Sequence, residues 1–182
     1  MVLRESKVVS IEFNKAEFLL KDPYGRSYSR DQLMGPNGLL IIFTCNHCPY
    51  AVALWDRLIR FSQDIKAKGI ETVAINPNIN PHYEADSPEN MKILIQNKSL
   101  PFPYLVDETQ STAKLYDAQC TPDIYLLDQN KNCSYHGRFD DNWKDESAMQ
   151  SFDLQNAVDA MLQGTALPNT FPSMGCSIKW NE

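Results

Sequence analysis

The sequence has no apolar run that approaches the roughly 18 residues needed to cross a bilayer. Its first twenty residues are interrupted by charges and lack the apolar core of an export signal. There is also no cluster of Lys and Arg to offset a net charge of -6. These absences argue against a membrane partner, a nucleic-acid partner and export. We therefore expect a cytoplasmic protein.

Several catalytic signatures are missing as well. The chain has no phosphate-binding glycine loop, no HExxH and no GxSxG, which excludes the nucleotide, metalloprotease and esterase sites that these motifs build. It also lacks internal repeats, low-complexity tracts and any long linker, so we expect one domain over residues 1–182. The five cysteines are an odd number, which fits one redox pair in a reducing compartment better than a secreted disulfide framework.

What the sequence does contain is a pair of cysteines, Cys45 and Cys48, separated by two residues. The apolar run 38–44 before them predicts a central strand that is buried on both faces. Pro49 after them suits the first turn of a helix. Apolar residues at helical spacing follow, namely Val52, Trp55, Leu58, Ile59 and Ile65. The pair is therefore predicted at a strand-to-helix junction.

A helix N-terminus stabilises a thiolate, because its partial positive charge and its unpaired N–H groups face the sulfur. We expect Cys45 to be the more exposed and more acidic thiol and the attacking group. Cys48 would then resolve the mixed disulfide. His47 is either a plain residue at the helix start or a partly protonated imidazole that favours the reduced pair. The alternatives for the cysteines are half of a zinc site and two buried core residues. A zinc site usually needs a second close pair, and the other cysteines, Cys120, Cys133 and Cys176, stand alone.

The rest of the chain predicts an α/β protein. Residues 1–29 read as short strands around the turn 23–25, which gives an N-terminal β-hairpin or edge addition, and 31–34 as a turn of helix. The strand 70–75 completes a parallel unit with the central strand. A loop at 76–87 and a helix at 88–98 form an insertion. Further elements are expected at 102–107 (strand), 110–116 (helix), 123–127 and 132–139 (a β-hairpin), and 152–162 (helix), followed by an extended tail at 165–182.

A C-x-x-C at such a junction, followed by Thr121-Pro122 directly before a hairpin and a terminal helix, resembles the thioredoxin fold. That fold is a central mixed sheet flanked by helices, and the resemblance implies a cis peptide bond before Pro122. The phrases Phe-Thr-Cys-Asn-His-Cys-Pro-Tyr, Asp-Asp-Asn-Trp and Gly-Cys-Ser-Ile-Lys-Trp resemble the alkyl hydroperoxide reductase/thiol-specific antioxidant (AhpC/TSA) group of this superfamily. The likeness extends over nearly the whole chain.

The chain departs from its relatives at the redox site. Peroxiredoxins carry P-x-x-x-T-x-x-C, and with Cys48 as the last position the Thr and Pro places hold Cys45 and Ile41. Classical thioredoxins have Trp before the first cysteine and Gly-Pro between the two, where this chain has Thr44 and Asn46-His47. The strand 38–44 also contains no carboxylate. The peroxidase signature is therefore absent.

We accordingly predict a thiol–disulfide oxidoreductase in which Thr121 and Pro122 shape the docking groove. The alternatives are a thiol-dependent peroxidase and a non-catalytic thioredoxin-like binding module. We expect no cofactor beyond the cysteine pair and no metal. The expected partners are protein or small-molecule disulfides and a dithiol electron donor, and the protein is expected to be a monomer or a homodimer.

The possible accessory residues are Thr44, Asn46, Cys120, Cys176 and Trp143. Cys120 is either an ordinary buried thiol, which is the preferred interpretation, or a thiol close to the pair, whereas Cys176 is either a packed tail residue or a resolving thiol. Trp143, with Asp140 and Asp141, is expected to cap the last helix region and pack against the tail, or else to contact substrate.

Overall fold

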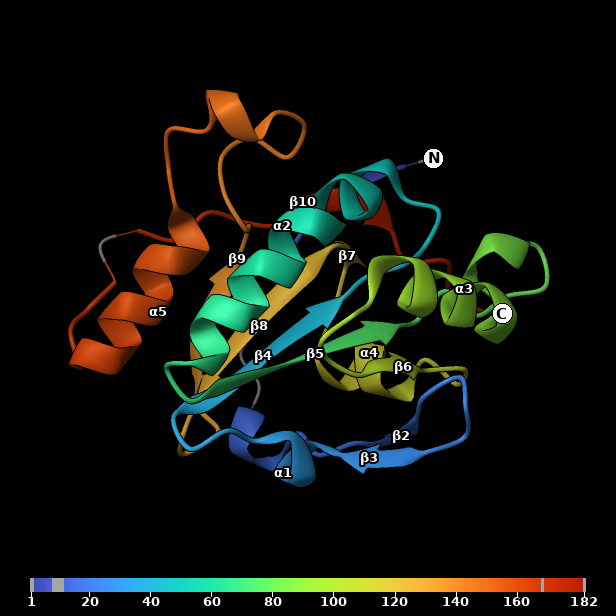
Figure 1. Ribbon diagram of the computed structural model, residues 1–182, viewed down its shortest axis with the longest axis horizontal. Helices are drawn as coiled ribbons and strands as arrows, with labels where there is room; N and C mark the ends of the chain where they lie inside the picture. The colour runs from blue at the N-terminus through green and yellow to red at the C-terminus, as the bar shows by residue number, and fades with distance from the viewer. Residues whose placement is uncertain (1, 8–11, 168, 182) are drawn as a thin grey trace.

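The computed structural model describes residues 2–7, 12–167 and 169–181. Its centre is a seven-stranded mixed sheet in the order β3-β2-β6-β5-β4-β8-β9 (Figure 1). The strands, in chain order, are β2 (Leu19–Lys21), β3 (Ser27–Ser29), β4 (Gly38–Phe43), β5 (Ile70–Asn76), β6 (Tyr104–Val106), β8 (Asp123–Asp128) and β9 (Cys133–Gly137). The predicted thioredoxin fold is confirmed.

Strand β4 is the axis of this sheet. It pairs in parallel with β5 and antiparallel with β8, and all six of its residues are buried. This is the behaviour expected of a continuous apolar run, which has no face to present to water. The junction that follows β4 is consequently held on both sides by neighbouring strands.

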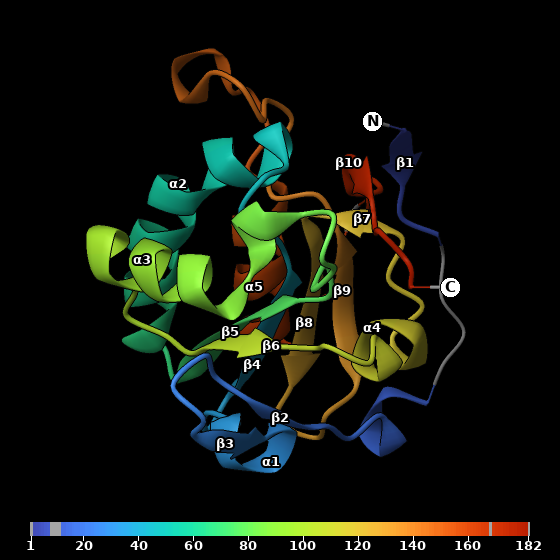
Figure 2. The same ribbon diagram turned by 90° about the vertical axis from the view of Figure 1, so that its right-hand side faces the viewer.

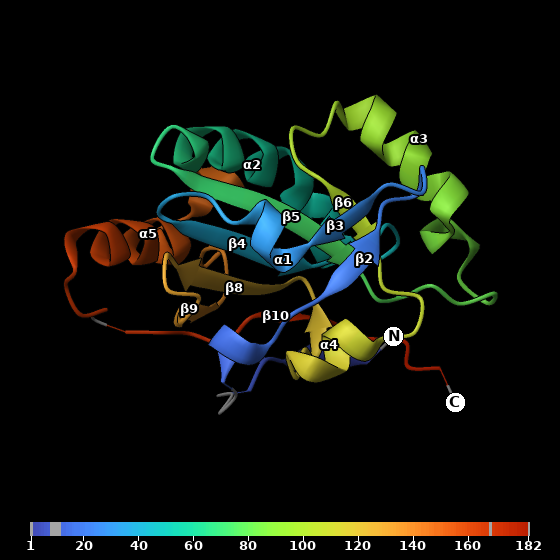
Figure 3. The same ribbon diagram turned by 90° about the horizontal axis from the view of Figure 1, so that it is seen from below.

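Five α-helices and three 3-10 turns are assigned in the described part of the chain. The α-helices are α1 (Arg30–Leu33), α2 (Pro49–Lys66), α3 (Pro88–Lys98), α4 (Ser111–Leu115) and α5 (Asp153–Gln163). The 3-10 turns are η1 (Phe13–Lys15), η2 (Glu84–Asp86) and η3 (Glu146–Ala148). Helices α2, α3 and α5 lie on one side of the sheet and α4 on the other (Figures 2 and 3). Each face has its own apolar cluster, one around Trp55 and the other around Tyr116.

A second, three-stranded sheet lies next to the start of α2. Its order is β1-β10-β7, where β1 is Leu3–Glu5, β10 is Met174–Ser177 and β7 is Cys120–Thr121. Both pairings are antiparallel. The two terminal segments of the described chain are thereby attached to the strand that precedes Pro122.

Most predicted elements are present, with changes at the two ends. The N-terminal hairpin is β2 and β3 around the turn 23–25, and the insertion consists of η2 and α3. An expected strand from Val8 to Phe13 falls partly on residues 8–11, outside the described residues, and Phe13 begins a 3-10 turn. The extended tail is confirmed but also forms β10, because the edge of β7 offers it backbone partners. In the described ranges, no helix combines the length and hydropathy that a membrane span requires.

Candidate active site

Both cysteines lie at the junction between β4 and α2, as predicted. The backbone N–H of Thr44 donates to the Ile75 carbonyl at 2.9 Å, which fixes the chain as it leaves the sheet. Cys48 is the N-cap of α2, and Pro49 occupies the first helical position. The Cys45 and Cys48 side chains both have 0% exposure. The expectation that Cys45 would be the more exposed thiol is therefore wrong, because Cys176 of β10 packs over the pair together with Ala51.

The residues before the β8–β9 hairpin form the opposite wall. The Thr121–Pro122 peptide bond is cis, as the resemblance implies. The Thr121 hydroxyl lies 3.3 Å from the Cys45 sulfur, and the Cys48 thiol donates to the Thr121 carbonyl at 3.0 Å. The structure thus brings together four of the predicted site residues from segments far apart in the sequence.

The surroundings of the two sulfurs push their pKa values in opposite directions. Hydrogen bonds from the thiol of Cys45, the thiol and N–H of Cys176 and the N–H of Ala51 lower the pKa of Cys48 to about 5. Burial of Cys48 acts in the opposite direction and raises its pKa, but the hydrogen bonds outweigh it. Burial, donation to Cys48 and the charge of Asp86 raise the pKa of Cys45 well above its usual value. The expectation that Cys45 is the more acidic thiol is also contradicted, since the N-cap position belongs to Cys48.

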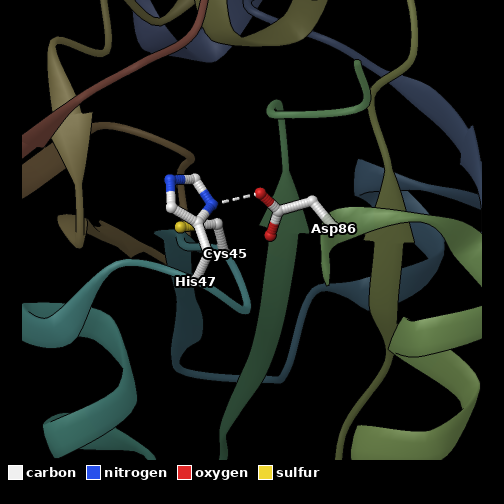
Figure 4. A group of neighbouring side chains, drawn as sticks. All are labelled: Cys45, His47 and Asp86. Atoms are coloured by element: carbon white, nitrogen blue, oxygen red, sulfur yellow. Dashed lines mark hydrogen bonds and ion pairs between the residues drawn. The ribbon is translucent and has the colours of Figure 1, made fainter. Parts of the chain in front are cut away.

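Asp86 is a residue of the site that the sequence analysis missed. It ends η2 in the insertion, and its side chain is fully buried. One carboxylate oxygen accepts the Asn46 N–H at 2.6 Å, and the other pairs with Nδ1 of His47. Figure 4 shows the imidazole turned towards this carboxylate next to the Cys45 sulfur. Tyr83 stacks on the other side of His47, with ring centroids 5.0 Å apart. The pair thus has a buried carboxylate beside it after all.

Asn46 fastens the insertion to the cysteine loop. Its side-chain amide donates to the Ala85 carbonyl at 2.8 Å, and its side-chain oxygen accepts from the Tyr104 hydroxyl at 3.0 Å. Asp86 lies outside the strand 38–44, where a thioredoxin-type carboxylate was expected and is absent. The available signal was that loop 76–87 leaves the same edge of the sheet as the cysteines.

Comparison with known proteins identifies the family of this chain. The model of the AhpC/TSA family matches residues 14–136, which is more than half of the chain. The chain belongs to the AhpC/TSA family. Comparison with curated proteins gave no match.

Solved structures share the fold of this chain. An uncharacterised conserved protein from Geobacillus kaustophilus is 38% identical, with a TM-score of 0.91 over 100% of this chain and 97% of that one. A hypothetical protein from Sinorhizobium meliloti is 34% identical, with a TM-score of 0.90 over 97% and 98% of the two chains. A secreted disulfide oxidoreductase from Mycobacterium tuberculosis shares the fold at 15% identity, with a TM-score of 0.60 over 80% and 96%.

One group of side chains at this AhpC/TSA site has the composition of a metal site. The ligand-type atoms of Cys45, His47 and Asp86 all lie within 4.8 Å of one another. However, zinc usually takes four ligands, and here the Nδ1 atom of His47 and the Asp86 carboxylate are already bonded to each other. The Nε2 atom of His47 is buried and has no hydrogen-bond partner in the described part of the chain. The absence of a metal stays a prediction.

A cavity of about 280 Å³ opens beside Pro122. Tyr50 and Trp143 line it together with Phe139 and Phe171, and the Tyr50 and Trp143 rings are 4.2 Å apart. Trp143 therefore lines a cavity that reaches Pro122 but not the sulfurs of Cys45 and Cys48. A pocket of this size and apolar lining can hold a side chain or a small molecule.

The loop that carries Trp143 is anchored differently from the expectation. Asp140 does not cap the last helix; it forms a buried ion pair with Arg57. Asp141 accepts the Gln150 N–H at 2.9 Å, within the same loop. Arg57 also donates to the Trp143 carbonyl at 2.8 Å. A buried arginine requires such partners. Arg57 extends from α2 directly beneath the loop, and the loop provides them.

The remaining cysteines separate into near and distant ones. Cys120 is fully buried, donates to the Pro122 carbonyl at 3.4 Å and has a pKa well above the usual value because of burial. Cys133 lies on β9, where its thiol donates to the Tyr135 carbonyl at 3.2 Å. Cys176 is nearly fully buried and packs with Cys45 and Cys48. It is thus the accessory cysteine that joins the pair.

Proposed function

We propose that this AhpC/TSA protein is a thiol–disulfide oxidoreductase that works through Cys45 and Cys48. The observation that carries the proposal is the position of Cys48 as N-cap of α2, with the Cys45 thiol donating to its sulfur. A thiolate stabilised in this way is the species that attacks a disulfide, and a second thiol within reach completes the exchange.

The acidity of Cys48 supports the attacking role for Cys48 and the resolving role for Cys45, which reverses the roles expected from the sequence. Its thiolate attacks one sulfur of a substrate disulfide, and the other sulfur leaves as a thiolate. Cys45 then loses its proton and attacks the Cys48 sulfur, which releases the second substrate thiol and leaves a Cys45–Cys48 disulfide. A dithiol donor reduces that disulfide for the next cycle. Both partners, and a cytoplasmic setting in which such donors are abundant, are parts of the proposal.

His47 and Asp86 act on the resolving thiol in this scheme. Burial, assisted by the charge of Asp86, keeps Cys45 protonated while Cys48 attacks, which prevents two adjacent thiolates from forming. The imidazole lies near the Cys45 sulfur, and its Nε2 atom, which has no hydrogen-bond partner in the described residues, is the nitrogen left to accept the Cys45 proton when resolution begins. Pro122, with Tyr50 and Trp143, lines the cavity in which the leaving group of the substrate would lie.

A thiol-dependent peroxidase is the second candidate, and the acidic Cys48 is the observation that favours it, because a thiolate is also what a peroxide oxidises. Against it, the places of the peroxiredoxin Thr and Pro hold Cys45 and the fully buried Ile41. A peroxide at Cys48 would meet a thiol and an alkyl group there. We therefore expect slow peroxide consumption alongside rapid disulfide reduction.

The test is reduction of bis(2-hydroxyethyl) disulfide with dithiothreitol as donor, compared with hydrogen peroxide consumption under the same conditions. We expect disulfide reduction to be lost in Cys48→Ser, to fall in Cys45→Ser, and to be unchanged in the matched control Cys133→Ser. Peroxide oxidation near the diffusional regime of about 10⁸ M⁻¹s⁻¹ would make the peroxidase the right assignment. If the protein shows neither activity, the non-catalytic binding module is the right assignment.

A further inference from the structure

Strand β10 brings a third thiol to the pair. Cys176 lies opposite Thr121 in the antiparallel β10–β7 ladder, and its side chain is only 3% exposed. Its side chain packs in one buried cluster with Cys45 and Cys48, and its thiol and backbone N–H help to lower the pKa of Cys48. Cys48 therefore has a thiol neighbour on each of two separate segments, Cys45 in its own loop and Cys176 on the terminal strand.

A close approach of two backbones makes this contact possible. Gly175 precedes Cys176, and a Cβ atom at that position would lie 2.1 Å from the Thr121 carbonyl oxygen. Only glycine lets β10 come this near to β7. The neighbouring thiol, Cys120, donates instead to the carbonyl of Pro122. Of the cysteines on the small sheet, Cys176 is the one that contacts the Cys48 sulfur.

We propose that Cys176 is a third redox-active thiol, which resolves mixed disulfides at Cys48 in competition with Cys45 and forms a Cys48–Cys176 disulfide. This proposal rests on the proposed function, because Cys48 must first attack a substrate disulfide. The product would fasten the terminal strand to the start of α2 by a covalent bond.

The chemistry balances without any further oxidant. After Cys48 has displaced one thiolate from the substrate disulfide, Cys176 gives up its proton to that thiolate. The Cys176 sulfur then bonds to the Cys48 sulfur, and the second substrate sulfur leaves as a thiolate that takes a proton from solvent. Two protein thiols are oxidised and one substrate disulfide is reduced to two thiols. Later attack by Cys45 on the Cys48 sulfur would give the Cys45–Cys48 disulfide and return Cys176 to a thiol.

The experiment uses the full chain with Cys45→Ser, which leaves Cys176 as the thiol that can resolve Cys48. The reduced variant is mixed with oxidised glutathione, quenched in acid, alkylated after denaturation and analysed by intact mass and peptide mapping. The comparison is Cys45→Ser/Cys176→Ser, and the matched control is Cys45→Ser/Cys133→Ser. We expect the glutathione adduct on Cys48 to be lost in Cys45→Ser and in Cys45→Ser/Cys133→Ser. It should be retained in full in Cys45→Ser/Cys176→Ser.

The outcomes separate this proposal from the function on which it rests. A glutathione adduct that persists on Cys48 in all three variants would overturn the role of Cys176 and leave disulfide exchange standing. No adduct on Cys48 in any variant would overturn the proposed function itself. Peptide mapping of the Cys45→Ser variant alone must also show the Cys48–Cys176 linkage, so the test stands even if replacing Cys176 prevents folding.

Discussion

The hydrogen bond from Cys45 is the leading cause of the acidity of Cys48, and removing it gives a sharp test of the site. In Cys45→Ala the donor is lost, whereas in Cys45→Ser a hydroxyl donor remains in its place. A hydrogen bond to a charged group is worth about 1.5–3 kcal/mol, and one pKa unit corresponds to about 1.4 kcal/mol. The pKa of Cys48 should therefore rise from about 5 to about 6 or 7 in the alanine variant and stay close to 5 in the serine variant.

The ultraviolet absorbance of the thiolate measures this directly. Burial raises the pKa of Cys45 and Cys120 well above the usual value, and that of Cys133 and Cys176 to about 12. Cys48 is thus the thiol expected to titrate below pH 8, and its absorbance should disappear as the pH falls through about 5. An alanine variant that titrates like the wild type would refute the assigned donor. A wild-type transition near 9 would refute the stabilised thiolate altogether.

Three further predictions concern the surroundings of the pair. Asp86→Asn removes a negative charge beside Cys45, so the pKa of Cys45 should fall and alkylation of Cys45 at alkaline pH should become faster, as peptide-resolved mass spectrometry would show. His47→Pro should lower the reduction potential by tens of millivolts in a glutathione titration, and an unchanged potential would leave His47 without a redox role. Arg57→Met leaves the buried Asp140 unpaired and should lower the free energy of unfolding by about 3–5 kcal/mol in urea, whereas the exposed pair of Arg60 makes Arg60→Met a control at about 1 kcal/mol or less.

The fold could be predicted from the sequence because the strongest signals in the sequence are local. The apolar run before Cys45 can only be a doubly buried strand, and the proline after Cys48 starts a helix whose apolar face repeats at the right spacing. Helix α3 begins at Ser87 and Pro88 as predicted, and the Ser87 side chain accepts the Asn90 N–H.

The chemistry of the site was less accessible because it depends on contacts between distant segments. The burial of Cys45 comes from β10, whose short run 174–177 has no periodicity to mark it as a strand. Asp86 is one of several acidic residues in a polar loop, and nothing in its neighbours distinguishes it from a solvated side chain. The relative acidity of Cys45 and Cys48 likewise depends on hydrogen-bond donors of Cys176, which lies far from both in the sequence.

The small β1-β10-β7 sheet has a consequence for the order in which the protein is made. Synthesis proceeds from the N-terminus, and domains begin to fold while the chain is still emerging from the ribosome. Helix α2 and strand β7 are released before β10, so the edge of β7 and both active thiols lack their cover during that interval. Before β10 pairs with β7, the cysteine pair therefore lacks both its cover and the hydrogen-bond donors of Cys176, so Cys48 is more exposed and less acidic. The arrival of β10 converts an open site into a closed one, and its timing sets how long Cys48 stays vulnerable.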